Sequence, residues 1–157
     1  IEKYLKWVIK GMSNYLEVTI ILTLAFAFSN LVGKLGTGAF IASISGGINP
    51  AFVPLMIFIV GALISFATGT SGGTVAVLIP IAIPMATSLD ASIPMTIGAI
   101  ISGGVFGDHC SPISDSTILS SMIAEVNVMD HVKTQMPYTL TSALIAGIGF
   151  LIFGIIL

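Results

Sequence analysis

The stretch FGDHCSPISDST, residues 106–117, decides how this sequence folds. It places two carboxylates, Asp108 and Asp115, on either side of Pro112, within a chain that is otherwise strongly apolar. Because proline lacks a backbone N–H and clashes with the preceding turn, a regular helix is not expected to continue through it. Neither apolar flank is long enough to cross a membrane, since a spanning helix needs about 20 residues. The sequence therefore predicts one spanning segment over 92–125, with an unwound break in its middle.

The composition of the whole chain is that of a membrane protein. Of its 157 residues, 55% are hydrophobic and 8% are charged, whereas soluble domains carry about 25% charged residues. The mean hydropathy is +1.10, and no charged residue occurs in 35–89 or in 134–157. This pattern excludes a soluble cytosolic enzyme and a disordered chain. The net charge of −2 argues against a nucleic-acid partner, and a single cysteine, Cys110, excludes an internal disulfide.

The remaining segments predict an all-α integral membrane protein. Residues 1–13 combine lysines at helical spacing with an apolar face, which predicts an amphipathic helix on the membrane surface. Two segments, 16–33 and 137–157, are each predicted to span the membrane. Residues 51–87 are predicted to form a hairpin, either re-entrant or fully crossing. Residues 36–50 are predicted to be a connector or a partly inserted helix, and 125–135 a short polar linker.

The predicted tip of the hairpin is TGTSGGT, residues 68–74. It contains only small and hydroxyl residues, which is unusual for a loop in water. Irregular backbone at membrane depth is tolerated only where protein buries it or where it lines a wet cavity. We expect Gly69, Gly72 and Gly73 to permit positive φ and a close approach of the tip to an ion or to the break. A larger side chain at Gly154, in the last span, is expected to change the apparent sodium affinity much less than one at Gly72.

The lysines give an orientation. With spans at 16–33, 92–125 and 137–157, four lysines fall on one side of the membrane and Lys34 falls on the other. The positive-inside rule then places residue 1 and the linker 125–136 in the cytoplasm. We expect a multi-pass protein of a cell membrane, of the bacterial or archaeal inner-membrane kind. Because the chain begins with Ile1 and ends on an apolar segment, we expect the C-terminal piece of a longer protein.

The residues around the break and the tip are candidates for binding an ion. A carboxylate at the bilayer centre costs about 2.5–3.5 kcal/mol on insertion scales, so it is expected to face a cavity, an ion or a proton. An unwound stretch also frees backbone carbonyls and two helix ends. Such hard oxygen ligands suit a hard cation like sodium. The candidate ion-binding residues are Asp108, Asp115, Ser111, Ser114, Ser116, Thr117, Thr70 and Ser71, with Asp108 and Asp115 as the metal ligands.

Structural interpretations compete with these assignments. Both acids can lie in an ordinary loop at the membrane edge, and single hydroxyls in membrane helices usually bond to their own backbone or pack against neighbouring helices. His109 is expected either to modulate the charge of Asp108 or to bond to a backbone carbonyl. A zinc or copper site is disfavoured because the other histidine, His131, lies in the polar linker. Cys110 is predicted to be a small buried side chain.

Two motifs resemble those of a known transporter family. Residues 106–117 resemble the G-D-x-x-S-P-x-S-D-S/T-T signature of the NhaC-type sodium/proton antiporter family. Residues 67–74 resemble that family's A-T-G-T-S-x-G-T segment, and residues 79–81 resemble its I-P-I continuation. The motifs occur in the family's order, and the likeness continues to the C-terminus. The one departure is Ser116, where threonine is usual.

The resemblance implies a transporter built from two inverted repeats, each with a hairpin and an unwound helix. This chain would supply one repeat, with the hairpin at 51–87 and the broken helix at 92–125. The implied activity is sodium/proton antiport, in which Asp108 and Asp115 exchange the two ions. Transported sodium and protons are expected in place of a cofactor. The expected partners are the N-terminal repeat of the same protein, membrane lipid, a small ion or organic solute, and a second copy in a homodimer.

Other functions remain open at this point. Members of the family exchange sodium or protons against different partners, so an exchanger of an organic acid or an amino acid is the first alternative. An intramembrane aspartyl protease also needs two acids at membrane depth. That chemistry usually has a Gly-x-Gly-Asp setting, and here Val105 stands in place of the first glycine. We therefore expect no enzyme. A structural subunit without a site is disfavoured by the pair of motifs.

Overall fold

The computed structural model of the chain describes residues 2–36, 40, 43 and 49–156. All regular elements within these ranges are helical, which confirms the predicted all-α class. Most of the predicted connector at 36–50 lies outside the described residues. The elements in chain order are α1 (Glu2–Lys34), the short helix η1 (Pro50–Phe52), α3 (Val53–Thr68), α4 (Ser71–Ser88), α5 (Ile93–Cys110), α6 (Asp115–Ile123) and α7 (Val128–Ile156).

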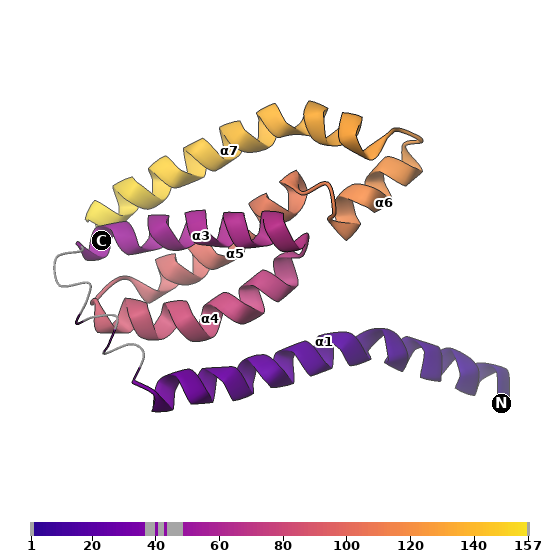
Figure 1. Cartoon of the computed structure of the whole chain (residues 1–157), viewed down its shortest axis with the longest axis horizontal. Helices are drawn as coiled ribbons and strands as arrows, with labels where there is room; N and C mark the ends of the chain where they lie inside the picture. The colour runs from indigo at the N-terminus through magenta and orange to yellow at the C-terminus, as the bar shows by residue number, and fades with distance from the viewer. Residues whose placement is uncertain (1, 37–39, 41–42, 44–48, 157) are drawn as a thin grey trace.

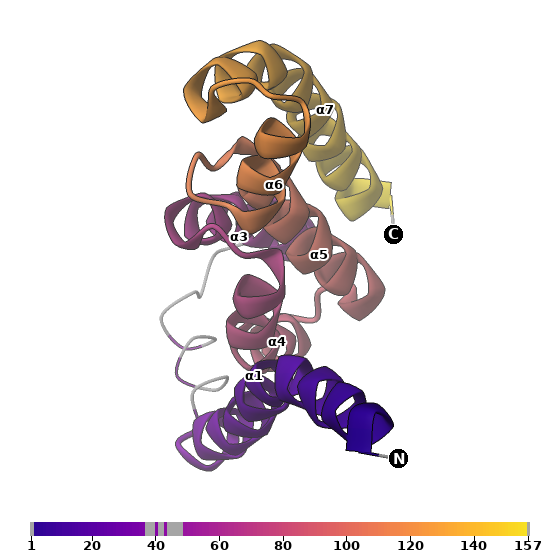
Figure 2. The same ribbon diagram turned by 90° about the vertical axis from the view of Figure 1, so that its right-hand side faces the viewer.

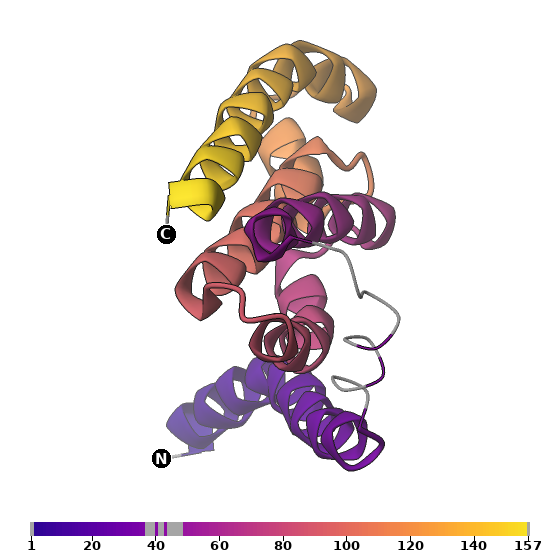
Figure 3. The same ribbon diagram turned by 90° about the vertical axis from the view of Figure 1, so that its left-hand side faces the viewer.

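The helices α3, α4 and α5 form the centre of the molecule (Figure 1). The helix α7 packs on one side of this group, against η1, α3 and α5, whereas α1 lies on the other side against α4. Figure 2 views the end at which α5 passes into α6. Figure 3 views the opposite end, where α7 terminates near the start of α3. The two predicted motifs both lie at the end seen in Figure 2.

Among the described helices, the most extensive packing is between α3 and α5. A Cβ atom added at Gly103 would collide with the carbonyl oxygen of Phe58, and one added at Gly107 would collide with that of Ala62. These glycines lie one helical turn apart on α5, so they let the two backbones touch along one face, as small residues commonly do between membrane helices. Leu78 of α4 and Ile100 of α5 belong to the adjoining buried core.

Among the described residues, three helical stretches are long and apolar enough to cross a membrane, namely Pro50–Thr68, Ser71–Ser88 and Val128–Ile156. The first two correspond to the predicted hairpin, and the third contains the predicted last span. The other predicted span, 16–33, lies within α1. The division between a surface helix at 1–13 and a span at 16–33 falls inside this single continuous helix, which bends along its length (Figures 2 and 3).

The predicted irregular tip at 68–74 is wrong in its extent. The helix α3 continues to Thr68 and α4 already starts at Ser71, which leaves only Gly69 and Thr70 outside a helix. Two residues suffice because Gly69 adopts a left-handed conformation with φ of 69°, and the Thr70 side chain accepts a hydrogen bond from the backbone N–H of Gly73. The glycine ends one helix and the threonine begins the next.

The predicted polar linker at 125–135 is also wrong, because α7 begins at Val128. The side chain of Asn127 accepts a hydrogen bond of 2.9 Å from the backbone N–H of Met129, which starts the helix. Polarity here reflects an exposed helical surface, on which Asp130 and Lys133 lie one turn apart. Gly154 is closely packed, since a Cβ atom there would collide with the carbonyl oxygen of Ala51. The expectation that it matters little for sodium binding stays a prediction.

Candidate functional site

The turn between α3 and α4 lies directly against the segment between α5 and α6. A Cβ atom added at Gly69 would lie 2.8 Å from the carbonyl oxygen of Ile113, closer than ordinary packing allows. A Cβ atom added at Gly104 of α5 would lie 3.5 Å from the carbonyl oxygen of Ser71. The two motifs, separate in the sequence, are therefore in contact through backbone atoms. Glycine is needed at position 69 both for its positive φ and for this approach.

The segment from Ser111 to Ser114 is a tight turn that separates α5 from α6. The backbone N–H of Ser114 donates to the carbonyl oxygen of Ser111 at 3.3 Å, which closes the turn. Pro112 occupies its second position, where a fixed φ near −65° is favourable. The hydroxyl of Ser111 accepts from the N–H of Ile113 at 3.4 Å. Pro112 thus ends α5 and also shapes the turn that follows.

Asp108 is joined to this turn by a chain of hydroxyl groups. The hydroxyl of Ser114 donates to Oδ1 of Asp108 at 2.5 Å, and the oxygens of Ser114 and Ser116 are 2.8 Å apart. Because the ionised carboxylate can only accept, the hydrogen of Ser114 is committed to Asp108 and Ser116 must donate to Ser114. Ser114 is fully buried and Asp108 is half-buried. This arrangement keeps three oxygens together beside the turn between α5 and α6.

Asp115 occupies a different position, in the first turn of α6. Its side chain is exposed, and no hydrogen bond among the described residues joins it to Asp108. A carboxylate at a helix N-terminus is stabilised by the unpaired N–H groups and the helix dipole. The structure therefore places one predicted acid within the hydroxyl chain and leaves the other beside it, at the start of the next helix.

The other predicted ligands serve partly structural purposes. Ser111 and Thr117 are buried, and the carbonyl oxygen of Thr117 accepts from the hydroxyl of Ser121 at 2.7 Å. Thr70 caps α4, as described above, and Ser71 lies against Gly104. Ser111, Thr70 and Ser71 retain oxygen atoms near the contact between the two motifs. Their placement agrees with both interpretations given from the sequence, ligand and structural support.

The structure differs from the prediction at Gly72 and Gly73. Nothing lies within 4 Å of a Cβ atom added at Gly72, and the nearest atom to one added at Gly73 is the methyl group of Thr70, within the same turn. Both residues are helical, so neither needs a positive φ. A Cβ atom would therefore meet open space at Gly72, whereas at Gly73 it would crowd the side chain of Thr70.

Ser65 is a residue of this region that the sequence analysis missed. It is fully buried on α3, and its hydroxyl donates to the carbonyl oxygen of Gly104 at 2.5 Å. This bond joins the last turns of α3 to α5 just before the break. A single serine within the apolar run 53–67 was the available signal, because a buried hydroxyl in such a run needs a partner.

His109 and Cys110 do not approach a metal-binding arrangement. The Nδ1 atom of His109 lies 2.8 Å from the carbonyl oxygen of Val105, which is the second of the two interpretations given above. Cys110 is buried, and its thiol contacts the hydroxyl of Thr139 at 3.1 Å. Within the described part of the chain, no group of three or more His, Cys, Asp or Glu side chains is placed to hold a metal ion.

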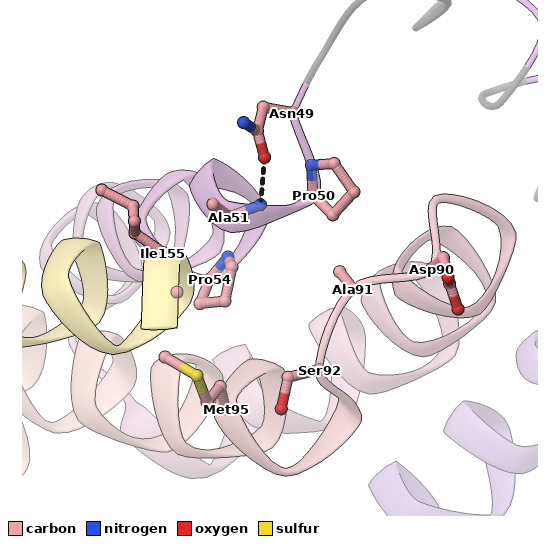
Figure 4. Close-up of a pocket in the computed structure, with 10 residues that line it drawn as sticks. Asn49, Pro50, Ala51, Pro54, Asp90, Ala91, Ser92, Met95 and Ile155 are labelled. Carbon is pink, nitrogen blue, oxygen red and sulfur yellow. Dashed lines mark hydrogen bonds between the residues drawn. The ribbon is translucent and has the colours of Figure 1, made fainter. Parts of the chain in front are cut away.

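A cavity of about 560 Å³ lies at the other end of the molecule (Figure 4). It is bounded by the start of α3, the turn between α4 and α5, and the end of α7. Asn49 accepts from the N–H of Ala51 at its rim, and Asp90 lies on the turn. None of the residues predicted for ion binding lines this cavity. It is therefore separate from the candidate site.

The chain was compared with known proteins. A family model described as the Na+/H+ antiporter family matches residues 1–155. A malate-2H(+)/Na(+)-lactate antiporter of Bacillus subtilis is 34% identical over 94% of this chain and 33% of its own length. The Na(+)/H(+) antiporter NhaC of the same organism is 27% identical over 95% of this chain and 33% of its length. An arginine/ornithine antiporter of Halobacterium salinarum is 38% identical over 63% of this chain and 20% of its own length.

The chain thus spans about a third or less of these relatives. All three are named as antiporters, two of them with sodium in the name. No solved structure matches the chain.

Proposed function

The chain belongs to the Na+/H+ antiporter family, and from this premise we propose that it forms one repeat of a longer, multi-pass transporter that exchanges sodium for protons. The length of the relatives supports this, because each is about three times as long as the chain or longer. The remainder of the transporter would supply a second, inverted repeat. Apolar helices of spanning length support a location in the cell membrane.

The proposed ion site is the contact between the two motifs. The observation that carries the proposal is the hydrogen-bonded chain of Asp108, Ser114 and Ser116 within the interruption between α5 and α6. Four helix ends meet nearby, since α3 and α5 end there and α4 and α6 begin there. Helix C-terminal carbonyls attract cations and N-terminal N–H groups attract anions. In other secondary transporters, the ends of interrupted helices bind substrate ions in this way.

The proposed exchange depends on competition for one carboxylate. A sodium ion favours the ionised form of Asp108, because it supplies the positive charge that a bound proton would otherwise supply. A proton on the same carboxyl removes the negative charge and expels the ion. Occupancy by sodium and by a proton is then mutually exclusive, and movement of one repeat against the other carries each across the membrane. Asp115, at the start of α6, is proposed as a second carboxylate that helps to balance the charge of the ion.

A second candidate function is exchange of an organic solute coupled to sodium or protons. It is supported by the names of the malate/lactate and arginine/ornithine relatives, which are 34% and 38% identical to this chain, against 27% for the sodium/proton antiporter. The two candidates share the ion site and differ in the second substrate. They are separated by whether sodium alone, without an organic solute, drives proton movement.

Replacement of the two acids tests the proposed ion site. We expect Asp108→Asn in the full-length transporter to abolish sodium-driven proton movement at normal expression, because the amide keeps the shape but can neither neutralise sodium nor carry the proton. Asp115→Asn is expected to reduce or abolish the exchange. The measurement is dequenching of a pH-sensitive dye in everted vesicles after sodium addition.

The control for this experiment is Asp90→Asn, since Asp90 lies in the exposed turn between α4 and α5 at the far end of the molecule. It should behave like the wild type. Dequenching by Asp108→Asn at the wild-type level would remove Asp108 from the ion site, and with it the main support for the proposal.

A further inference from the structure

A groove between α5 and α7 lies outside the proposed ion site. Its volume is about 560 Å³, and its walls are mainly apolar side chains of α3, α5 and α7. Phe58 and Phe106 form part of the wall, with ring centroids 6.2 Å apart. Polar side chains also line the groove from both helices, namely Ser102 and His109 from α5 and Gln135, Tyr138, Thr139 and Ser142 from α7. A groove of this kind suits a small amphipathic molecule.

Gln135 contributes a buried acceptor that has no donor. Its Oε1 atom is inaccessible to water, and no hydrogen-bond donor reaches it among the described residues. An unpaired buried acceptor costs about 1–3 kcal/mol, so a donor that enters the groove would recover this free energy. The terminal torsion of a glutamine side chain is broad, which allows the amide to turn toward such a donor. Oε1 of Gln135 can therefore accept a hydrogen bond from an N–H or O–H group of a ligand.

His109 contributes a second acceptor. Its Nδ1 atom lies 2.8 Å from the carbonyl oxygen of Val105, and because a carbonyl only accepts, Nδ1 must carry the hydrogen. In the neutral ring, Nε2 then has a free lone pair. The groove thus offers acceptors from both α5 and α7. The aromatic rings beside them attract a positive charge through their π faces.

We propose that this groove binds an amphipathic organic amine. The N–H groups of the amine pair with Oε1 of Gln135 and Nε2 of His109, and its apolar body lies against Phe58 and Phe106. An organic carboxylate of the same shape is a poorer ligand, because it has no donor for Oε1 of Gln135 and leaves that acceptor unpaired. This site is distinct from the proposed sodium site, since Asp108, Ser114 and Ser116 do not line the groove.

The test measures binding of two probes with the same apolar body and different heads, phenethylamine and hydrocinnamate. The full-length transporter is reconstituted in nanodiscs at fixed sodium concentration, and empty nanodiscs give the background from partition into lipid. We expect saturable binding of the amine by calorimetry and at least tenfold weaker binding of the carboxylate, the difference expected for a hydrogen bond to a charged group. Asp108→Asn should leave amine binding unchanged, so failure of the ion site and failure of the groove are distinguishable.

Three variants locate the amine. Gln135→Leu should weaken amine binding about tenfold, because it removes the acceptor at nearly constant volume. Gln135→Glu should strengthen it, since a carboxylate is a better acceptor for an ammonium group, and this variant keeps the test decisive if the leucine protein does not fold. Thr141→Val, on α7 outside the groove and bonded to its own helix, should bind like the wild type. The proposal is overturned by equal binding of both probes, by no amine binding up to about 10 mM, or by wild-type affinity in both Gln135 variants.

Discussion

The hydroxyl group of Ser114 has neighbours on both sides, the carboxylate of Asp108 and the hydroxyl of Ser116. While Asp108 is ionised, Ser114 donates to it. Once Asp108 carries a proton, the carboxyl group becomes a donor, and Ser114 can accept from it by rotation of a single bond. The buried serine can therefore form a hydrogen bond with both the ionised and the protonated acid, without a rearrangement of the backbone. On the proposed mechanism this is what lets sodium and protons alternate at one position.

Removal of this hydroxyl should weaken sodium binding. Ser114→Ala takes away a hydrogen bond to a charged group, which is worth about 1.5–3 kcal/mol, and it takes away one oxygen near the proposed ion. We expect the half-maximal sodium concentration for exchange to rise about tenfold or more. Ser120→Ala is the control, because that exposed serine of α6 bonds to the carbonyl of Thr117 and lies outside the hydroxyl chain. Equal sodium dependence in the two variants would show that Ser114 only packs.

At the scale of elements, the candidate site depends on how closely the hairpin of α3 and α4 approaches α5 and the break. Glycines make both contacts: Gly107 meets α3 at the carbonyl of Ala62, and Gly69 meets the carbonyl of Ile113. Asp108 directly follows Gly107 in the chain. Separation of α3 from α5 would therefore also displace the acid. Helix packing and the proposed ion site are therefore linked at this one helical turn.

The turn of the hairpin offers a matched pair of substitutions. Gly69→Ala places a Cβ atom against Ile113 and forces an L-residue to a φ of 69°, which costs about 1–2 kcal/mol for the backbone alone. Gly72→Ala adds its Cβ to open space at the start of a helix, where alanine is favoured. We expect Gly69→Ala to lower the thermal unfolding midpoint and the apparent sodium affinity. Gly72→Ala should preserve both, and a larger effect at Gly72 would contradict the described contact.

The contact between α3 and α5 can be tested in the same way. Gly107→Ala and Gly149→Ala both replace a helical glycine, so the gain in helix propensity, about 1 kcal/mol, is similar for the two. The added Cβ at 107 collides with α3, whereas nothing lies within 4 Å of the one at 149. We expect a lower unfolding midpoint and impaired exchange for Gly107→Ala only. Wild-type stability of that variant would show that the helices are not in close contact there.

Sequence patterns predicted the types of these elements better than their limits. Apolar runs and Pro112 located the helices and the turn between α5 and α6, because hydropathy and the missing proline N–H act locally. The extent of the 68–74 tip was wrong because Thr70 caps α4 with its own side chain, so the small residues after it are helical. The linker was wrong because Asn127 starts a helix whose first turns are polar.

At the candidate site, the residue types were likewise easier to predict than their contacts. Asp108 and the hydroxyl residues were predicted from the chemistry that polar groups need in an apolar chain. Their partners were not, since the pairing of Ser114 with Asp108 depends on the geometry of the turn, and the bond from Ser65 to Gly104 joins residues distant in the sequence. The contact of Gly69 with Ile113 likewise arises only when the hairpin packs against α5. The sequence predicted that Gly69, Gly72 and Gly73 would be equivalent, and only tertiary packing distinguishes them.

At the scale of the whole molecule, much of the apolar surface is exposed. Large side chains along α7, among them Leu144, Ile145 and Phe153, have more than half of their surface uncovered. The 18-residue apolar window of α7 has none of its residues buried within the chain. Lipid and the remaining two thirds of the proposed transporter would cover this surface. The proposed ion site would then lie between two repeats, as alternating access requires.

The measurement that tests the account most directly is the half-maximal sodium concentration for exchange across about pH 6 to 9, in proteoliposomes of the full-length transporter. If sodium and a proton exclude each other at one carboxylate, protons favour the neutral acid and sodium favours the ionised one. Apparent sodium affinity must then fall by about tenfold for each unit that the pH drops through the proton-binding range, and it must level off at higher pH. We expect this profile for the wild type. A flat profile over the whole range would contradict the account, because it would show that sodium binds without displacing a proton.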